Sequence, residues 1–278
     1  MKLAISMVLL ASAMIAADNP ASPFHDPNLD AIVRKYLGNV KPGQPLSPTS
    51  LEAAMLVSEQ NTPVKDLAGL EQCKNLRYLY LPESPIADLT PLAQLDKLEA
   101  VTIRGGKVQD LAPLAGLTKL EYLDLSQNEV TDLKPLANLK SLKYLYLSNN
   151  RIADLTPLES LSNLQSLHVD GNQVSDVNPL AKLKNLLSVD LRKNHIADVS
   201  PLGKLTNWHE LYLDQNQIGD VAPLVAATQG DLKQVVAPVR TLSLAGNPLS
   251  AAARTKELPD LRKQLFDVLL EKGGSPNH

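Results

Sequence analysis

This chain contains a phrase of 22 residues that restarts at a fixed interval. The copy that begins at Leu120 reads LEYLDLSQNEVTDLKPLANLK. An eighth, altered copy opens at Val239. A fixed period of this length is typical of a solenoid, in which each repeat packs only against its neighbours. Seven copies keep register to residue 224 without an insertion, and they begin at Leu76, Leu98, Leu120, Leu142, Leu164, Leu186 and Trp208.

The first half of each repeat predicts a short strand. Its fourth and sixth positions are apolar in every copy, as at Leu123 and Leu125. This alternation places one face of a strand inward and the other outward. One strand per repeat is expected to lie parallel to the next at about 4.8 Å. The scarcity of aromatic core residues agrees, since the 278 residues include only two Phe, and leucine suffices to fill the layers of a stack.

The ninth position holds an amide that is suited to a turn. A side-chain amide both donates and accepts, so it can satisfy backbone groups that leave a strand inside the stack. Ser84 and Gly106 interrupt the column in the first two full copies. The asparagines are Asn128, Asn150, Asn172, Asn194, Asn216 and Asn247.

The second half of each repeat predicts a tight turn and a one-turn 3₁₀ helix. In its motif D-L-x-P-L, Asp accepts backbone donors and Pro favours a helix start. The aspartates lack the ligand spacing of calcium loops, so we predict neither a metal site nor a cofactor. They are Asp66, Asp88, Asp110, Asp132, Asp154, Asp176, Asp198 and Asp220.

The two ends are expected to differ from the repeats. Residues 1–17 have the pattern of a secretory signal peptide, with an uncleaved anchor as the alternative, which predicts an extracytoplasmic protein. Residues 18–60 are interpreted as a helical cap, with helices over 24–38 and from Ser47-Pro48. Residues 61–250 contain the repeats, of which Val64–Asn75 is half a copy. Residues 251–278 are interpreted as a capping helix, over 258–272, and a tail.

Three irregularities have separate interpretations. Nine extra residues fall in the last full repeat, and 225–237 is expected to form a longer helix or a loop. Trp208 replaces the usual Leu and is interpreted as a core residue. Cys73 occupies a leucine column, so we expect a buried apolar thiol rather than a reactive one.

The repeat length, the D-L-x-P-L turn and the entry phrase FHDPNLDAIVRKYLG followed by VKDLAGLEQCKNLRYLYL resemble bacterial leucine-rich repeat proteins of the internalin type. The resemblance covers about residues 24 to 250. It implies an α/β solenoid shaped as a horseshoe, with a parallel concave sheet, 3₁₀ turns on the convex side and helical caps. Members of this family are binding proteins, and some grip host receptors through the concave sheet. The surface-anchored internalins have a C-terminal anchoring region, which we expect this chain to lack.

The third, fifth and seventh positions of each repeat are expected to face outward on the concave side. Six of the seven tyrosines occupy these columns, although Thr or Ser would suit a strand equally well. Tyr provides a rigid contact area with a polar tip, as protein-binding surfaces require; its strand propensity is the alternative explanation. The candidate partner-binding residues are Tyr78, Tyr80, Arg104, Tyr122, Tyr144, Tyr146, His168, Asp190, Arg192 and Tyr212.

Other functions fit the sequence less well. His168 and Asp190 are expected to be neighbours with Ser166 or Ser188 nearby, but an open sheet offers no oxyanion hole, so no catalytic residue is predicted. A net charge of −3 and a pI near 6.0 give no basic footprint for nucleic acid. We therefore predict a non-enzymatic, monomeric module that binds a protein and does not insert in a membrane. A scaffold that acts through its convex or inserted surface is the alternative.

Overall fold

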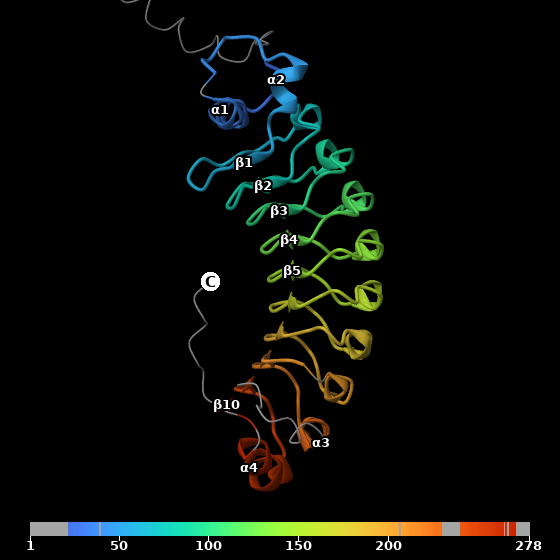
Figure 1. Cartoon of the computed structure of the whole chain (residues 1–278). Coiled ribbons are helices and arrows are strands. Elements are labelled where there is room, and N and C mark those ends of the chain that lie inside the picture. Colours follow the sequence, from blue (N-terminus) through green and yellow to red (C-terminus); the bar gives the residue numbers. More distant parts are fainter. Residues whose placement is uncertain are drawn as a thin grey trace, which may run out of the picture.

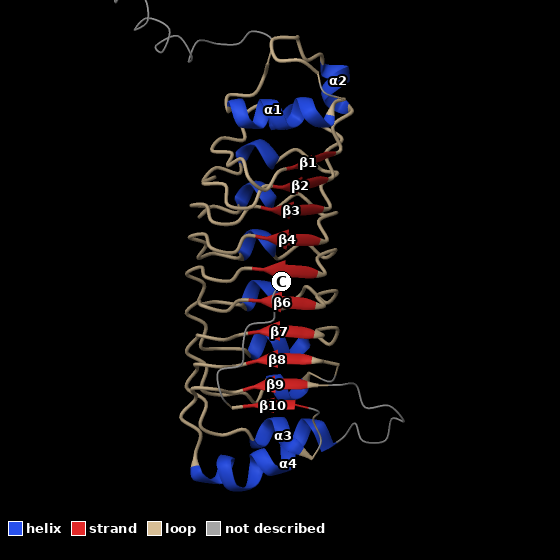
Figure 2. Ribbon diagram, turned by 90° about the vertical axis from the view of Figure 1, so that its left-hand side faces the viewer, coloured by secondary structure: helices blue, strands red, loops and turns tan. Residues whose placement is uncertain are grey.

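The repeats build one open, curved stack of coils. The computed structural model describes residues 22–38, 40–205, 207–229, 240–263, 265 and 267–270. Within these ranges, ten parallel strands form one sheet in chain order (Figures 1 and 2). The predicted α/β horseshoe is confirmed. The strands are β1 (Leu56–Ser58), β2 (Tyr78–Tyr80), β3 (Ala100–Thr102), β4 (Tyr122–Asp124), β5 (Tyr144–Tyr146), β6 (Ser166–His168), β7 (Ser188–Asp190), β8 (Glu210–Tyr212), β9 (Thr241–Ser243) and β10 (Asp267–Leu269).

The predicted 3₁₀ turns lie on the opposite, convex side of the stack (Figure 1). In the Asp132 turn, the carboxylate accepts a hydrogen bond from the Lys134 N–H at 2.9 Å, and the helix follows at once. The other seven aspartates of the column make the same bond. The 3₁₀ helices are η1 (Leu70–Gln72), η2 (Thr90–Leu92), η3 (Ala112–Leu114), η4 (Lys134–Leu136), η5 (Thr156–Leu158), η6 (Asn178–Lys182) and η7 (Leu202–Lys204).

In the last full repeat an α-helix, α3 (Ala222–Gln229), takes the place of the 3₁₀ helix. It begins after the Asp220 turn, where the Ala222 N–H donates to the carboxylate at 2.8 Å. A longer helix or a loop was expected over 225–237, and the structure has a helix in the first part of this range, up to Gln229. Residues 230–237 lie outside the described residues, as do the expected signal peptide at 1–17 and the tail after residue 270.

The core is a continuous column of leucine layers. Leu123 and Leu125 are fully buried, as are the equivalent residues of the other repeats. Cys73 is fully buried in its leucine column, and this burial, with Glu71 as a smaller cause, raises the pKa of its thiol to about 12. Trp208 is also buried, and the Arg240 guanidinium lies 5.2 Å from its ring centroid. Both predictions of core residues are confirmed.

The asparagine column connects each coil to the one before it. Asn128 accepts from the Val108 N–H at 3.0 Å and donates to the Ile103 and Leu125 carbonyls at 2.8 and 3.0 Å. The asparagines thus satisfy backbone groups of two coils at once. Ser84 replaces only the acceptor of the asparagine, because its hydroxyl accepts a hydrogen bond from the Val64 N–H at 3.1 Å.

Gly106 interrupts the column for a steric reason. A Cβ at this position would lie 2.4 Å from the Ile86 carbonyl oxygen and 2.8 Å from Oδ1 of Asn128. The close approach of neighbouring coils therefore excludes any side chain here.

The predicted first helix is present as α1 (Pro27–Tyr36), with Asp26 as its N-cap. The Asp26 carboxylate accepts from the Asn28 N–H at 2.8 Å and from the Lys65 N–H at 2.6 Å, so it ties the helix to the first coil. Gly38 follows the helix with a φ of +85°, a left-handed value that suits glycine.

Two element predictions are wrong in part. The second helix, α2 (Pro48–Glu52), ends early, and Leu56 belongs instead to β1, which pairs with β2. At the other end, helical structure covers 251–262, including α4 (Leu258–Arg262), and residues 267–269 form β10 against β9. In both places an apolar segment pairs with an open sheet edge, because the edge otherwise leaves its backbone groups without partners.

Candidate functional site

The candidate site is the concave face of the sheet. Each three-residue strand places one buried residue between two outward ones, and adjacent strands pair in register. Tyr122 is therefore opposite Tyr144, and Tyr146 is opposite His168. The outward residues thus form files that run across the strands along the length of the stack.

Four of the predicted residues form one aromatic cluster. The Tyr122 ring on β4 lies near both tyrosines of β5, with its centroid 6.2 Å from that of Tyr144 and 5.4 Å from that of Tyr146. The Tyr146 ring meets His168 edge to face at 4.8 Å. Burial, followed by the charge of Asp124, raises the pKa of the Tyr122 phenol to about 12. Since such contacts fix the rings before any partner arrives, the cluster is a preformed rigid surface.

The remaining tyrosines lie apart from this cluster. Tyr78 and Tyr80 are on β2, and the small residues Ala100 and Thr102 of β3 separate them from it. The Tyr78 hydroxyl donates to Oε2 of Glu99 at 2.9 Å, and this hydrogen bond raises the pKa of the phenol. The structure therefore divides the predicted tyrosine file into separate groups.

Each predicted charged residue is paired with a side chain of opposite charge. Asp190 is 3% exposed, and the Arg192 guanidinium donates to it through Nε at 2.9 and 3.0 Å. Arg192 also lies 5.2 Å from the ring centroid of Tyr212. Arg104 is 3.5 Å from the Asp124 carboxylate. Asp190 is thus less accessible than the sequence suggested.

The hydrogen bonds near His168 do not form a serine-activating arrangement. The Ser188 hydroxyl donates to Oε2 of Glu210 at 2.8 Å, and Nε2 of His168 lies 3.5 Å from the same hydroxyl oxygen. The serine proton is therefore directed to Glu210, whereas a catalytic serine needs the histidine as its proton acceptor. In the described part of the chain, no group of three His, Cys, Asp or Glu side chains has a metal-binding arrangement.

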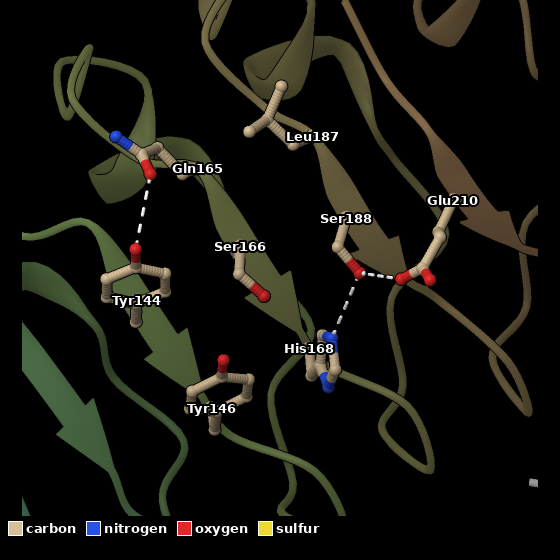
Figure 3. Close-up of a pocket in the computed structure, with 8 residues that line it drawn as sticks. All are labelled: Tyr144, Tyr146, Gln165, Ser166, His168, Leu187, Ser188 and Glu210. Carbon is tan, nitrogen blue, oxygen red and sulfur yellow. Dashed lines mark hydrogen bonds between the residues drawn. The ribbon is translucent and has the colours of Figure 1, made fainter. Parts of the chain in front are cut away.

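A hollow of about 260 Å³ lies beside the aromatic cluster (Figure 3). Its base consists of Ser166 and Ser188, whose short side chains leave space above the sheet. The surrounding residues are Tyr144, Tyr146, Gln165, His168, Leu187 and Glu210.

Part of this surface lies at positions that the repeat pattern did not indicate. Gln165 and Leu187 occupy the second position of their repeats, which was not counted as outward, and yet they line the hollow. Met55 and Leu56 are 56% and 37% exposed, and Leu56 extends the third-position file beyond Tyr78. Val57 lies one 22-residue period before Leu79, and this spacing indicates a strand at β1.

Comparisons with known proteins agree with this architecture. A family model described as leucine rich repeats (2 copies) matches residues 140–182 and 184–226, and a leucine rich repeat model matches residues 96–152. Internalin C2 of Listeria monocytogenes is 37% identical over 73% of this chain and 92% of its own, with a TM-score of 0.71. The chain belongs to the internalin-type leucine-rich repeat proteins.

Further relatives of this internalin-type protein extend the comparison. Internalin F of Listeria monocytogenes is 30% identical over 91% of this chain and 70% of its own, with a TM-score of 0.80. The leucine-rich repeat ectodomain of a plant receptor kinase from Arabidopsis thaliana is 20% identical over 81% of this chain and 28% of its own, with a TM-score of 0.64. The latter likeness is one of fold alone. No curated protein matches the chain.

The fold of this internalin-type protein is consistent with a protein-interaction module, because a curved solenoid presents an extended concave surface. None of the helices within the described ranges combines the length and the apolar character that crossing a bilayer requires.

Proposed function

We propose that this chain is an exported, non-enzymatic module that binds a protein partner on its concave sheet. The observation that supports this most is the aromatic cluster of Tyr122, Tyr144, Tyr146 and His168. Its rings are held against one another on an outward face, although packing of the coils does not require aromatic residues there. Rigid aromatic side chains lose little conformational freedom on binding, which makes them effective anchors.

The other predicted residues surround this anchor in the proposal. Tyr78 and Tyr80 on β2 and Tyr212 on β8 would extend the contact along the stack. Arg104 and the Asp190–Arg192 pair would contribute polar contacts around the anchor, which usually add more to specificity than to affinity. The partner is a protein rather than a nucleic acid, since the chain has a net charge of −3.

Export is proposed from the apolar segment within residues 1–17 and from the internalin-type family. A bacterial source and a secreted or periplasmic location are proposed on the same grounds. A monomeric state is part of the same proposal.

The test is the double variant Tyr144→Ala with Tyr146→Ala. Loss of a buried interface aromatic often costs about 2 kcal/mol or more, which is roughly thirtyfold in affinity. The variant should keep the circular dichroism spectrum of wild type. In affinity capture from extracytoplasmic fractions, it should bind much less of the partner protein than wild type does. A matched control is Thr118→Ala with Lys119→Ala, two exposed residues between η3 and β4.

The control should retain the partner as well as wild type does. Equal retention by the tyrosine variant and wild type would place the binding surface elsewhere on the molecule.

A further inference from the structure

The hollow beside the aromatic cluster has a defined chemistry at each boundary. Tyr144, Ser166, Ser188 and Glu210 are consecutive residues of the third-position file, because β5 to β8 pair in register. Tyr144 and Glu210 therefore close the two ends, and the serines form the base (Figure 3). Three strand spacings of about 4.8 Å separate the ends, or roughly 14 Å between backbones.

The sides of the hollow also differ from each other. Gln165 and Leu187 line one side, and Tyr146 and His168 line the other (Figure 3). The hollow is thus a trough with a tyrosine at one end and a carboxylate at the other, and its sides combine the apolar surface of Leu187 and Tyr146 with the polar groups of Gln165 and His168. It would match an elongated side chain that has an apolar stem and a polar head.

Charge decides which polar head fits. The Glu210 carboxylate accepts a hydrogen bond from the Ser188 hydroxyl, and within the described residues no Lys or Arg side chain forms an ion pair with it. The third, fifth and seventh positions of the repeats that contain β6 to β8 hold one guanidinium, Arg192, and four carboxylates. The carboxylates are Asp170, Asp190, Glu210 and Asp214. This half of the face therefore has three excess negative charges, whereas Arg104 and Asp124 balance each other in the half before it.

We propose that this trough receives a lysine or arginine side chain of the protein partner, with its cationic head at Glu210. The inference rests on the proposed concave binding function and names the chemistry of one contact. The four-carbon stem of lysine, or the stem of arginine, would lie along Leu187 and the tyrosine rings. A leucine in the same place would leave the carboxylate facing an apolar group, and an acidic side chain would be repelled.

Two peptides of equal shape test this inference on the purified full chain. The capped pentapeptides Gly-Gly-Arg-Gly-Gly and Gly-Gly-citrulline-Gly-Gly differ in the charge of one side chain. Each is titrated into ¹⁵N-labelled protein while the amide signals of Ser166, Leu187 and Ser188 are followed. The arginine peptide should shift these amides saturably, and the citrulline peptide should bind up to about fivefold more weakly, as loss of a partly exposed ion pair predicts.

A charge variant locates the effect. Glu210→Gln keeps the shape of the side chain and an acceptor for Ser188, and it should weaken binding of the arginine peptide to the citrulline level. It should leave binding of the citrulline peptide unchanged. The matched control Glu121→Gln removes one carboxylate of an exposed side chain that does not line the trough, and it should change neither affinity.

Several outcomes would overturn the inference. They are equal binding of the two peptides, an equally strong response to Gly-Gly-Leu-Gly-Gly, and no saturable shift with any peptide. The two peptides already decide the matter in wild type, so the answer does not depend on a variant folding.

Failure of the inference is distinguishable from failure of the proposed function. If the tyrosine variant loses its partner while the peptides do not bind, concave binding stands and the cation site is wrong. If the arginine peptide binds selectively while the tyrosine variant still retains its partner, the trough is a cation site and the proposed anchor is wrong.

Discussion

Asn172 shows at the scale of one residue how the coils are joined. Its Nδ2 donates to the Leu147 and Val169 carbonyls at 2.9 and 3.0 Å, and its Oδ1 accepts from the Ile152 N–H at 2.9 Å. Leu147 and Ile152 belong to the preceding coil, and Val169 belongs to the same coil as Asn172. One buried amide therefore satisfies backbone groups that water does not reach.

Asn172→Ala should destabilise the protein by about 2–4 kcal/mol, because it leaves several buried backbone groups without partners. Chemical denaturation followed by circular dichroism should show a lower midpoint. The neighbouring control Gln173→Ala removes an exposed side chain and should change stability by no more than about 0.5 kcal/mol. Similar midpoints for the two variants would contradict the assigned role of the amide.

The ionised Asp170 side chain destabilises the folded protein, whereas the Asn172 amide stabilises it. Burial, and then the charge of Asp190, raise the pKa of its carboxyl above the ordinary value of 3.8. Its contribution to stability is fully present below pH 3.8 and is lost as the pH rises through the raised value. Asp170→Asn should therefore raise the melting temperature at pH 7, while the Asn oxygen can still accept from Ser148. The gain over wild type should vanish below pH 3.8.

Asp154 provides a control with the reverse sign. Hydrogen bonds from the side chain and the backbone N–H of Thr156 lower the pKa of its carboxyl below 3.8. Its stabilising effect is present above pH 3.8 and is lost as the pH falls through the lowered value. Asp154→Asn should therefore lower the melting temperature at pH 7 and have little effect in strong acid. The same sign for both variants at pH 7 would refute this assignment.

At the scale of elements, the regular parts could be predicted because each column has its own physical reason. Alternating leucines predict a strand, and the Asp-Leu-x-Pro-Leu motif predicts a turn and a 3₁₀ helix. β1 was not predicted because Ala54 and Thr62 stand where later repeats have Leu and Asn, although Val57 keeps the register. Residues 265–270 were interpreted as helical because a short apolar segment suits a helix and a strand equally.

The hollow was beyond prediction for a different reason. Its existence depends on the sizes of side chains in four successive coils, with Ser166 and Ser188 between the larger Tyr144 and Glu210. Sequence spacing places these residues in one file but does not say which side chains bend into the space. Sequence spacing also does not predict that Arg192 binds the Asp190 carboxylate, because that contact depends on the rotamers of both side chains.

At the scale of the whole molecule, a stack of coils has two open ends. At the first end, α1 covers the core and Asp26 fixes it to the first coil. At the other end, β10 pairs with β9, and the Leu244 N–H donates to the Leu269 carbonyl at 2.9 Å. Val268 packs inward beside it, at 9% exposure. β10 therefore closes both the hydrogen-bonding edge of the sheet and its apolar layer.

A chain that stops after Lys263 should retain the helical segment and lose β10. It would expose the edge of β9 together with the apolar layer beneath Leu265 and Val268, and such edges template association with other chains. Light scattering after size-exclusion chromatography should show oligomers or aggregate. The matched control stops after Leu270, retains β10 and should elute at the monomer mass. If the shorter chain were also monomeric with an unchanged melting temperature, β10 would not be the element that closes this end of the stack.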